Sequence, residues 1–140
     1  MRKTEQRLWD RMRHAIKDQL YYERIENMVG TGRPDIDIGH AGIFFPVELK
    51  AVDAYPARPT TPVLGARGLS QKQKNWWLRW RSFGGKGFIL VGVELDLFCV
   101  LAQHSEVLNS YTKTELEKFA TSWPEFIHTV KREAQCIRGL

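Results

Sequence analysis

The sequence has only two cysteines in 140 residues, Cys99 and Cys136, and they lie far apart. This excludes a disulfide framework and a four-cysteine zinc site. Cys99 lies in the apolar run LFCVL, so we expect a small buried residue there. No apolar run approaches the ~18 residues of a membrane helix. The N-terminal MRKTEQRLWDRMRH has no apolar stretch behind its basic residues, so we expect no secretory signal and a cytoplasmic, nucleoid-associated protein.

Acidic residues are scarce in one long stretch. Between Lys50 and Gly87 there are eight basic residues and one acidic residue, Asp53, which gives a net charge of +7 against +5 for the whole chain. The same stretch carries the aromatic residues Tyr55, Trp76, Trp77, Trp80 and Phe83. A basic segment with aromatic residues is typical of a surface that binds a polyanion, most often nucleic acid. The alternative is a solvated helix face.

The length fits one domain over residues 1–140, with a core at about 4–101 and C-terminal helices at 105–140. Its 43% apolar and 26% charged residues exclude a disordered chain. Apolar residues recur at three- and four-residue steps from Thr4 to Leu20, which predicts an amphipathic helix. Residues 21–29 are a strand or a continuation of that helix. Strands are predicted at 34–38 and 43–52, around a turn at 39–42.

Residues 53–69 hold three prolines and two glycines and predict a long loop, of a kind that is usually functional or mobile. Ser70-x-x-Gln73 predicts a capping box that opens a helix, which Gly84-Gly85 ends. Two more strands are predicted at 87–93 and 96–101. Capping boxes at Thr112-x-x-Glu115 and Ser122-x-x-Glu125 predict two C-terminal helices. This order indicates an α/β or α+β sheet flanked by helices.

Three of the charged residues on the two central predicted strands form a candidate site. Glu48 and Lys50 are two apart, so their side chains share one face. Asp35 lies on the preceding strand of the hairpin, within a few ångströms across the ladder. Buried charges are costly unless paired or bound to metal, and paired carboxylates suit Mg²⁺. Lys50 could then orient or deprotonate a water, or stabilise charge on a phosphate.

The alternative is a solvent-facing ion pair. The strand is apolar on both faces, however, with Phe44 and Pro46 on the face of Glu48 and with Phe45, Val47 and Leu49 on the other. We therefore expect both faces of the strand to be covered. Charged side chains buried there would need a partner or a bound metal.

Pro34-Asp35, twelve residues, and then Glu48-Leu49-Lys50 resembles the signature of the PD-(D/E)XK nuclease superfamily. Gly32-x-Pro34-Asp35 is similar to the GxPD form of its VRR-NUC and phage Holliday-junction-resolvase-like group. Leu69-Ser70-x-x-Gln73 before Trp76-Trp77 resembles the LSxxQ-x-x-W helix of that group. The run from Gly84-Gly85 to Val91 resembles its glycine turn into an apolar strand. The resemblance covers about residues 32–93.

The resemblance implies a restriction-endonuclease-like α/β core with a central mixed sheet of four to five strands. It also implies a Mg²⁺-dependent endonuclease, with Mn²⁺ as a substitute, that cleaves branched DNA such as Holliday junctions. A homodimer with two sites in a bacterial or phage-infected cell would follow. The implied metal ligands are Asp35, Glu48, the Leu49 carbonyl and Glu5.

Five further residues are candidates with alternatives. Glu5 lies beside the inner stripe of the first helix and is the candidate helix-borne acid, with Glu23 in reserve; the alternative is a favourable helix-dipole contact. Gln73 is either a site residue, a cap, or both. Asp37 is a metal ligand, an outer group or a strand-end charge. His40 is expected in the hairpin turn, in solvent.

The basic segment supplies the candidate DNA contacts, which are Arg58, Arg67, Lys72, Lys74 and Arg79. Three alternatives to a branched-DNA nuclease stay open. They are a nuclease of linear, nicked or single-stranded DNA, a DNA-binding module of nuclease fold that does not cleave, and a partner-binding protein.

Overall fold

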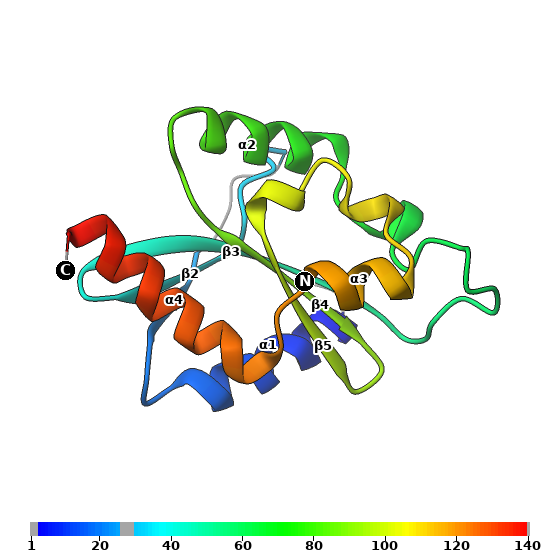
Figure 1. Cartoon of the computed structure of the whole chain (residues 1–140), viewed down its shortest axis with the longest axis horizontal. Coiled ribbons are helices and arrows are strands. Elements are labelled where there is room, and N and C mark those ends of the chain that lie inside the picture. Colours follow the sequence, from blue (N-terminus) through cyan, green and yellow to red (C-terminus); the bar gives the residue numbers. More distant parts are fainter. Residues whose placement is uncertain (1–2, 26–29, 140) are drawn as a thin grey trace.

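A computed structural model describes residues 3–25 and 30–139. One mixed sheet runs through the molecule, with α2 on one side and α1 and α4 on the other (Figure 1). The helices are α1 (Lys3–Ile16), α2 (Gln71–Ser82), α3 (Lys113–Phe119) and α4 (Trp123–Arg138). The strands are β1 (Tyr21–Arg24), β2 (Ile36–His40), β3 (Ile43–Val52), β4 (Phe88–Val93) and β5 (Asp96–Leu101). Short 3₁₀ turns lie at Gly65–Arg67, Ala102–His104 and Leu108–Ser110.

The sheet has five strands in the order β1-β2-β3-β4-β5. All neighbours are antiparallel except β3 and β4, which are parallel. A parallel pair needs a crossover, and the segment that contains α2 provides it. The predicted mixed sheet of four to five strands is confirmed, and β3 lies at its centre.

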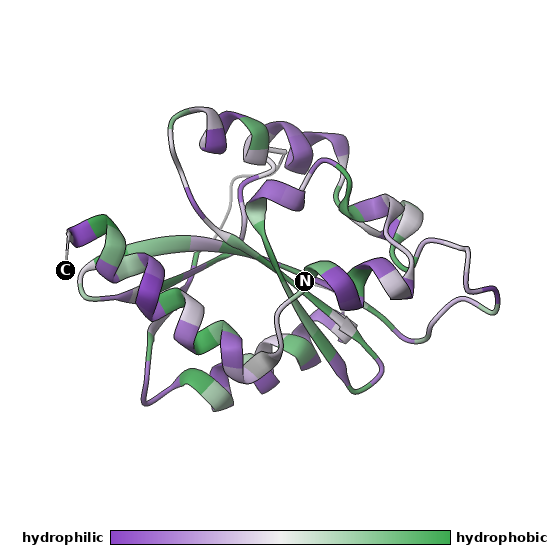
Figure 2. Ribbon diagram, viewed as in Figure 1, coloured by the Kyte–Doolittle hydropathy of each residue, from purple (hydrophilic) through white to green (hydrophobic). Residues whose placement is uncertain are grey.

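Two apolar cores cover the two faces of the sheet. The first joins α1 and α4 to one side of β3, through residues such as Met12, Leu49 and Phe126. The second lies under α2 and α3, around Trp77 and Leu116. Figure 2 shows strongly apolar central strands between helices of mixed character. The strand β3 is therefore covered on both sides, as its sequence predicts, and Cys99 is buried as expected.

One predicted boundary near the N-terminus is wrong, and one open alternative is decided. The first helix ends at Ile16 and not at Leu20, because the chain turns there with the amides of Gln19 and Leu20 bonded to the Ile16 carbonyl. Leu20 is nonetheless 4% exposed, so it continues the apolar pattern without being helical. Residues 21–24 form a strand, while residues 26–29 lie outside the described residues.

The central hairpin is also tighter than predicted. Its second strand begins at Ile43 as expected, but its first strand is Ile36–His40 and not 34–38. The turn has only two residues, Ala41 with φ 53° and Gly42 with φ 80°. Two successive positive φ values are typical of the type I′ hairpin turn. His40 therefore ends a strand, which corrects its predicted place in the turn.

Helix α2 begins as the sequence predicts. The Ser70 hydroxyl accepts a bond from the Gln73 amide, and the Gln73 side chain accepts one from the Ser70 amide. The box at Thr112 and Glu115 is equally complete. The box predicted at Ser122 is not: α4 begins there, but the Ser122 side chain makes no capping bond.

The predicted long loop is anchored at its C-terminal part. Val63, Leu64 and Leu69 are buried in the second core. The Asn109 side chain accepts a bond from the Leu69 amide and donates one to the Leu69 carbonyl, at 2.8 and 2.9 Å. No helix among residues 3–25 and 30–139 is long and apolar enough to cross a membrane.

Candidate active site

Glu48 and Lys50 lie buried on the face of β3 that α2 covers. Glu48 is 7% exposed and Lys50 is 8% exposed. Lys50 Nζ lies 3.7 Å from Glu48 Oε1, so the two form an ion pair. Removing either partner from such a buried pair would leave an uncompensated charge. The solvent-facing ion pair considered from the sequence is therefore excluded.

Gln73 reaches this pair from the first turn of α2. Its side-chain Nε2 donates a hydrogen bond of 2.9 Å to Glu48 Oε1. Its side-chain oxygen accepts from the Ser70 amide in the same geometry. One side chain thus closes the capping box and also bonds the Glu48 carboxylate.

Asp35 and Glu5 bring further negative charge to Glu48. Ile36 pairs with Val47 across the hairpin, so continuing the register by one residue places Asp35 opposite Glu48. The pKa of Glu48 is raised to about 8, mainly by burial, with Lys50 lowering it and the charges of Asp35 and Glu5 raising it. The structure therefore brings Glu5, from the first turn of α1, within electrostatic range of Glu48.

The reserve candidate Glu23 lies elsewhere. It pairs with Asp37 across β1 and β2, and its charge raises the pKa of Asp37 rather than that of Glu48. Burial is the main cause that raises the Asp37 pKa, and Arg33 lowers it. Of the two candidate glutamates, Glu5 is the one whose charge acts on the pKa of Glu48.

The donors around Glu48 suit a hard cation in kind. Carboxylate oxygens are the ligands that Mg²⁺ takes in proteins, together with several waters. The Leu49 backbone lies between Glu48 and Lys50, while its side chain enters the opposite core. Across residues 3–25 and 30–139, no three His, Cys, Asp or Glu side chains form a ready-made metal cage. The residue types therefore fit Mg²⁺, without a preformed cluster.

Arg33 is a neighbour of the site that sequence reasoning missed, and it contacts Trp76 of the predicted helix. Arg33 Nη2 lies 3.3 Å from Asp37 Oδ2, and its guanidinium carbon lies 5.8 Å from the centre of the Trp76 ring. Trp76 in turn stacks on Trp80 at 5.6 Å and 20°. The Gly32-Arg33-Pro34-Asp35 run and the helix pattern that ends in Trp76 were the local signals, but neither predicts that the two segments meet.

The basic segment divides into two groups in the structure. Of the candidate DNA contacts, Lys74 is half-buried and the others, Arg58, Arg67, Lys72 and Arg79, are exposed. Arg81 and Lys86, by contrast, form ion pairs with Glu106 at 3.7 Å and Glu133 at 2.5 Å. The cations chosen from the sequence therefore remain accessible, whereas two of their neighbours serve internal contacts.

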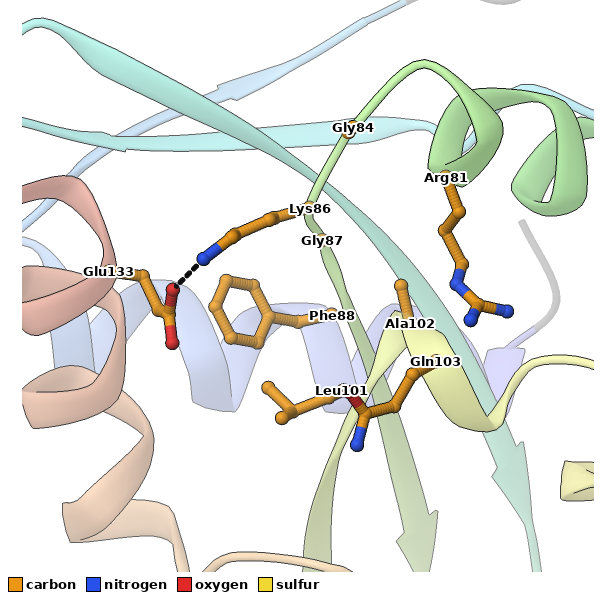
Figure 3. Close-up of a pocket in the computed structure, with 10 residues that line it drawn as sticks. Arg81, Gly84, Lys86, Gly87, Phe88, Leu101, Ala102, Gln103 and Glu133 are labelled. Atoms are coloured by element: carbon orange, nitrogen blue, oxygen red, sulfur yellow. Dashed lines mark hydrogen bonds and ion pairs between the residues drawn. The ribbon is translucent and has the colours of Figure 1, made fainter. Parts of the chain in front are cut away.

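A hollow of about 280 Å³ lies away from the carboxylates. Figure 3 shows Lys86 and Glu133 joined on one side of it, Arg81 on the other, and Phe88 and Leu101 beneath. None of the candidate catalytic residues lines this hollow. The ion pair ties α4 to the loop before β4, so the hollow belongs to the scaffold around the site.

Comparison with known proteins shows the fold. No protein-family model matches the chain, and no curated protein does. A solved structure does match, that of Hjc, a Holliday junction resolvase from the archaeal hyperthermophile Archaeoglobus fulgidus. The TM-score is 0.60 at 15% identity, over 87% of this chain and 98% of that one. The chain therefore has the restriction-endonuclease-like fold of that resolvase.

Proposed function

We propose that this chain is a metal-dependent endonuclease that hydrolyses phosphodiester bonds in branched DNA. The observation that carries the proposal is the convergence of Lys50 and Gln73 on one buried carboxylate, Glu48. The charges of Asp35 and Glu5 act on the same carboxylate. Catalysis of phosphodiester hydrolysis relies on placed charges of this kind.

The residues would act in distinct ways. Asp35, Glu48, the Leu49 carbonyl and Glu5 would hold Mg²⁺ or Mn²⁺, which when bound supplies an activated water and a polarised phosphate oxygen. Lys50 adds a positive charge where the phosphate becomes more negative. Gln73 fixes the Glu48 carboxylate in one orientation through its 2.9 Å bond. Such outer contacts typically affect activity by about 10- to 100-fold.

The choice of branched DNA rests on two likenesses. The GxPD and LSxxQ-x-x-W patterns resemble those of the VRR-NUC and phage resolvase-like group, and the structural neighbour is a Holliday junction resolvase. Resolving a junction requires two cuts, which favours a homodimer with two sites. The exposed cations Arg58, Arg67, Lys72 and Arg79, with Lys74, would contact DNA phosphates. A protein with this role would work in the cytoplasm, at the nucleoid.

A DNA-binding module without cleavage is the second candidate. A binding surface gains nothing from a buried carboxylate, because negative charge repels phosphate. The buried Glu48 and its partners therefore favour the enzyme.

The test uses the full chain with junction, flap, linear duplex and single-stranded DNA, each with Mg²⁺, Mn²⁺ or a chelator. We expect metal-dependent cleavage of the branched forms first. Asp35→Ala and Glu48→Ala should abolish cleavage yet keep or tighten DNA binding, because a repulsive charge is gone. Glu5→Ala should also lose activity, whereas Glu23→Ala serves as the matched control on β1.

Calorimetry with Mn²⁺ decides the metal assignment independently of activity. Wild type should bind Mn²⁺ more tightly than Asp35→Ala does. Equal affinity in the two proteins would remove Asp35 from the ligand set. Binding of DNA without cleavage in either metal would support the second candidate instead.

A further inference from the structure

Arg33 is held between an acid and an aromatic ring. Its Nη2 donates to both carboxylate oxygens of Asp37, at 3.4 and 3.3 Å. Its guanidinium carbon lies 5.8 Å from the centre of the Trp76 ring, within cation–π range. The side chain is still 36% exposed. Arg33 is therefore a cation of fixed position that stays accessible to solvent.

The two residues that contact Arg33, Trp76 and Asp37, share a helix face or a sheet face with candidate catalytic residues. Trp76 follows Gln73 by three positions on α2, so the two side chains share a helix face. Asp37 pairs with Pro46 on β3, two residues before Glu48, and so shares its sheet face. Arg33 itself precedes Asp35 by two residues. These relations place the guanidinium at the rim of the Glu48 site.

We propose that Arg33 binds a DNA phosphate next to the one that is cleaved, and that Asp37 and Trp76 position it for this contact. The inference rests on the nuclease function proposed above. A centre made of Asp35, Glu48 and Glu5 repels a polyanion, so DNA needs a cation close by.

The chemistry of the arginine suits this role. A guanidinium presents five N–H donors in one plane, enough to serve a carboxylate and a phosphate together. Its fork matches phosphate oxygens, and a side chain that is already ordered loses less freedom on binding. In this proposal Asp37 is a positioning residue rather than a metal ligand.

A purely structural ion pair is the competing explanation, and Arg13 supplies the matched control. Arg13 Nη2 lies 3.2 Å from Asp10, and its guanidinium carbon lies 6.0 Å from the centre of the Trp9 ring. It therefore makes the same two kinds of contact, but near the end of α1 on the other side of the sheet. Comparing Arg33→Ala with Arg13→Ala separates two effects: the loss of a cation near Glu48, and the loss of an arginine that contacts an acid and an aromatic ring.

The experiment measures affinity for junction DNA against salt concentration in chelator. Arg33→Ala should lower the affinity by at least about 10-fold at low salt, the effect of losing one charge-assisted hydrogen bond. It should also flatten the slope of log affinity against log salt by about 0.9. Arg13→Ala should change neither. With metal, Arg33→Ala should raise KM more than it lowers kcat, because the lost contact is one of uniform binding.

Two further variants keep the test decisive if Arg33→Ala folds poorly. Arg33→Lys should keep the salt slope but bind less tightly, because an ammonium lacks the fork. Asp37→Asn should weaken DNA binding while its Mn²⁺ affinity in calorimetry stays at the wild-type value. A drop in Mn²⁺ affinity would overturn the positioning role of Asp37. Wild-type affinity and slope in Arg33→Ala, beside a wild type that cleaves, would overturn the inference and leave the proposed nuclease intact.

Discussion

Gln73 donates a hydrogen bond of 2.9 Å from its side-chain nitrogen to Glu48, twenty-five positions earlier in the chain. The same side chain closes the capping box with Ser70. The start of α2 and the centre of the candidate site therefore share one residue. A change at Gln73 alters both the helix and the carboxylate, and suitable substitutions can separate the two effects.

Gln73→Glu separates capping from carboxylate contact. Glutamate at this position still caps the helix, because a capping box accepts Glu or Gln. It replaces the donor to Glu48 with a second negative charge, so we expect cleavage to fall roughly 10-fold or more. Gln73→Ala should also lose the bond from the Ser70 amide, while the Ser70 hydroxyl keeps its bond to the backbone of residue 73, so the unfolding free energy should fall by about 1 kcal/mol. Urea denaturation and single-turnover cleavage measure the two effects, and equal stability of the two variants would contradict the shared role.

The pKa of Glu48 predicts how stability depends on pH in chelator. Burial first, with Asp35 and Glu5, raises this pKa from 4.5 to about 8 against the effect of Lys50. Between these values the unfolded chain has lost the proton that the folded chain keeps. The contribution to stability is therefore complete below pH 4.5 and is lost as pH rises through about 8, by up to about 1.4 kcal/mol per pH unit.

Glu48→Gln is the matched variant for this prediction. It keeps the shape and cannot ionise, so the difference in unfolding free energy between variant and wild type should grow with pH. Urea denaturation at several pH values provides the measurement. Parallel pH profiles of the two proteins would show that Glu48 titrates normally.

Lys50→Ala should act on turnover more than on binding. We expect single-turnover cleavage to fall by at least about 100-fold, the size typical of losing one placed charge in the transition state. DNA affinity should fall by less than about 10-fold, since several other cations contact the backbone. Lys50→Arg should not rescue fully, because the guanidinium is bulkier and cannot release a proton. Cleavage at the wild-type rate in Lys50→Ala would show that its ion pair with Glu48 is purely structural.

The accessible cations should set the salt dependence of DNA binding. Alanine at Arg58, Arg67, Lys72 and Arg79 together should flatten the slope of log affinity against log salt by up to about 0.9 per lost contact. Arg81→Ala with Lys86→Ala removes two cations of the same segment that are already paired with Glu106 and Glu133, so its slope should stay near wild type. If the paired cations matter more than the exposed ones, the DNA lies on another face.

The sequence predicted the central strand and its charges because their signals are local. Strand β3 has its predicted bounds, since apolar residues on both faces mark a covered strand. The spacing of Glu48 and Lys50 fixes their common face once that strand is known. The capping box gave the start of α2, and hence the approach of Gln73, for the same reason.

Long-range contacts and backbone exceptions account for the rest. Leu20 extends the apolar period beyond the end of its helix because it is buried without being helical. Ala41 takes a positive φ that few residues other than glycine adopt, so its two-residue turn has no clear local signal. The contacts of Arg33 with Trp76 and of Arg81 with Glu106 join segments whose approach only the folded sheet determines.

The mixed sheet also orders the assembly of the site in time. Asp35 and Glu48 flank a hairpin closed by the two-residue turn at Ala41 and Gly42, a local contact that forms within microseconds. We expect Gln73 to approach them later, when the long crossover closes and β4 pairs in parallel with β3, because non-local parallel pairing is slow. The carboxylates should therefore meet early in folding, and the amide that orients Glu48 should arrive with the last cooperative step.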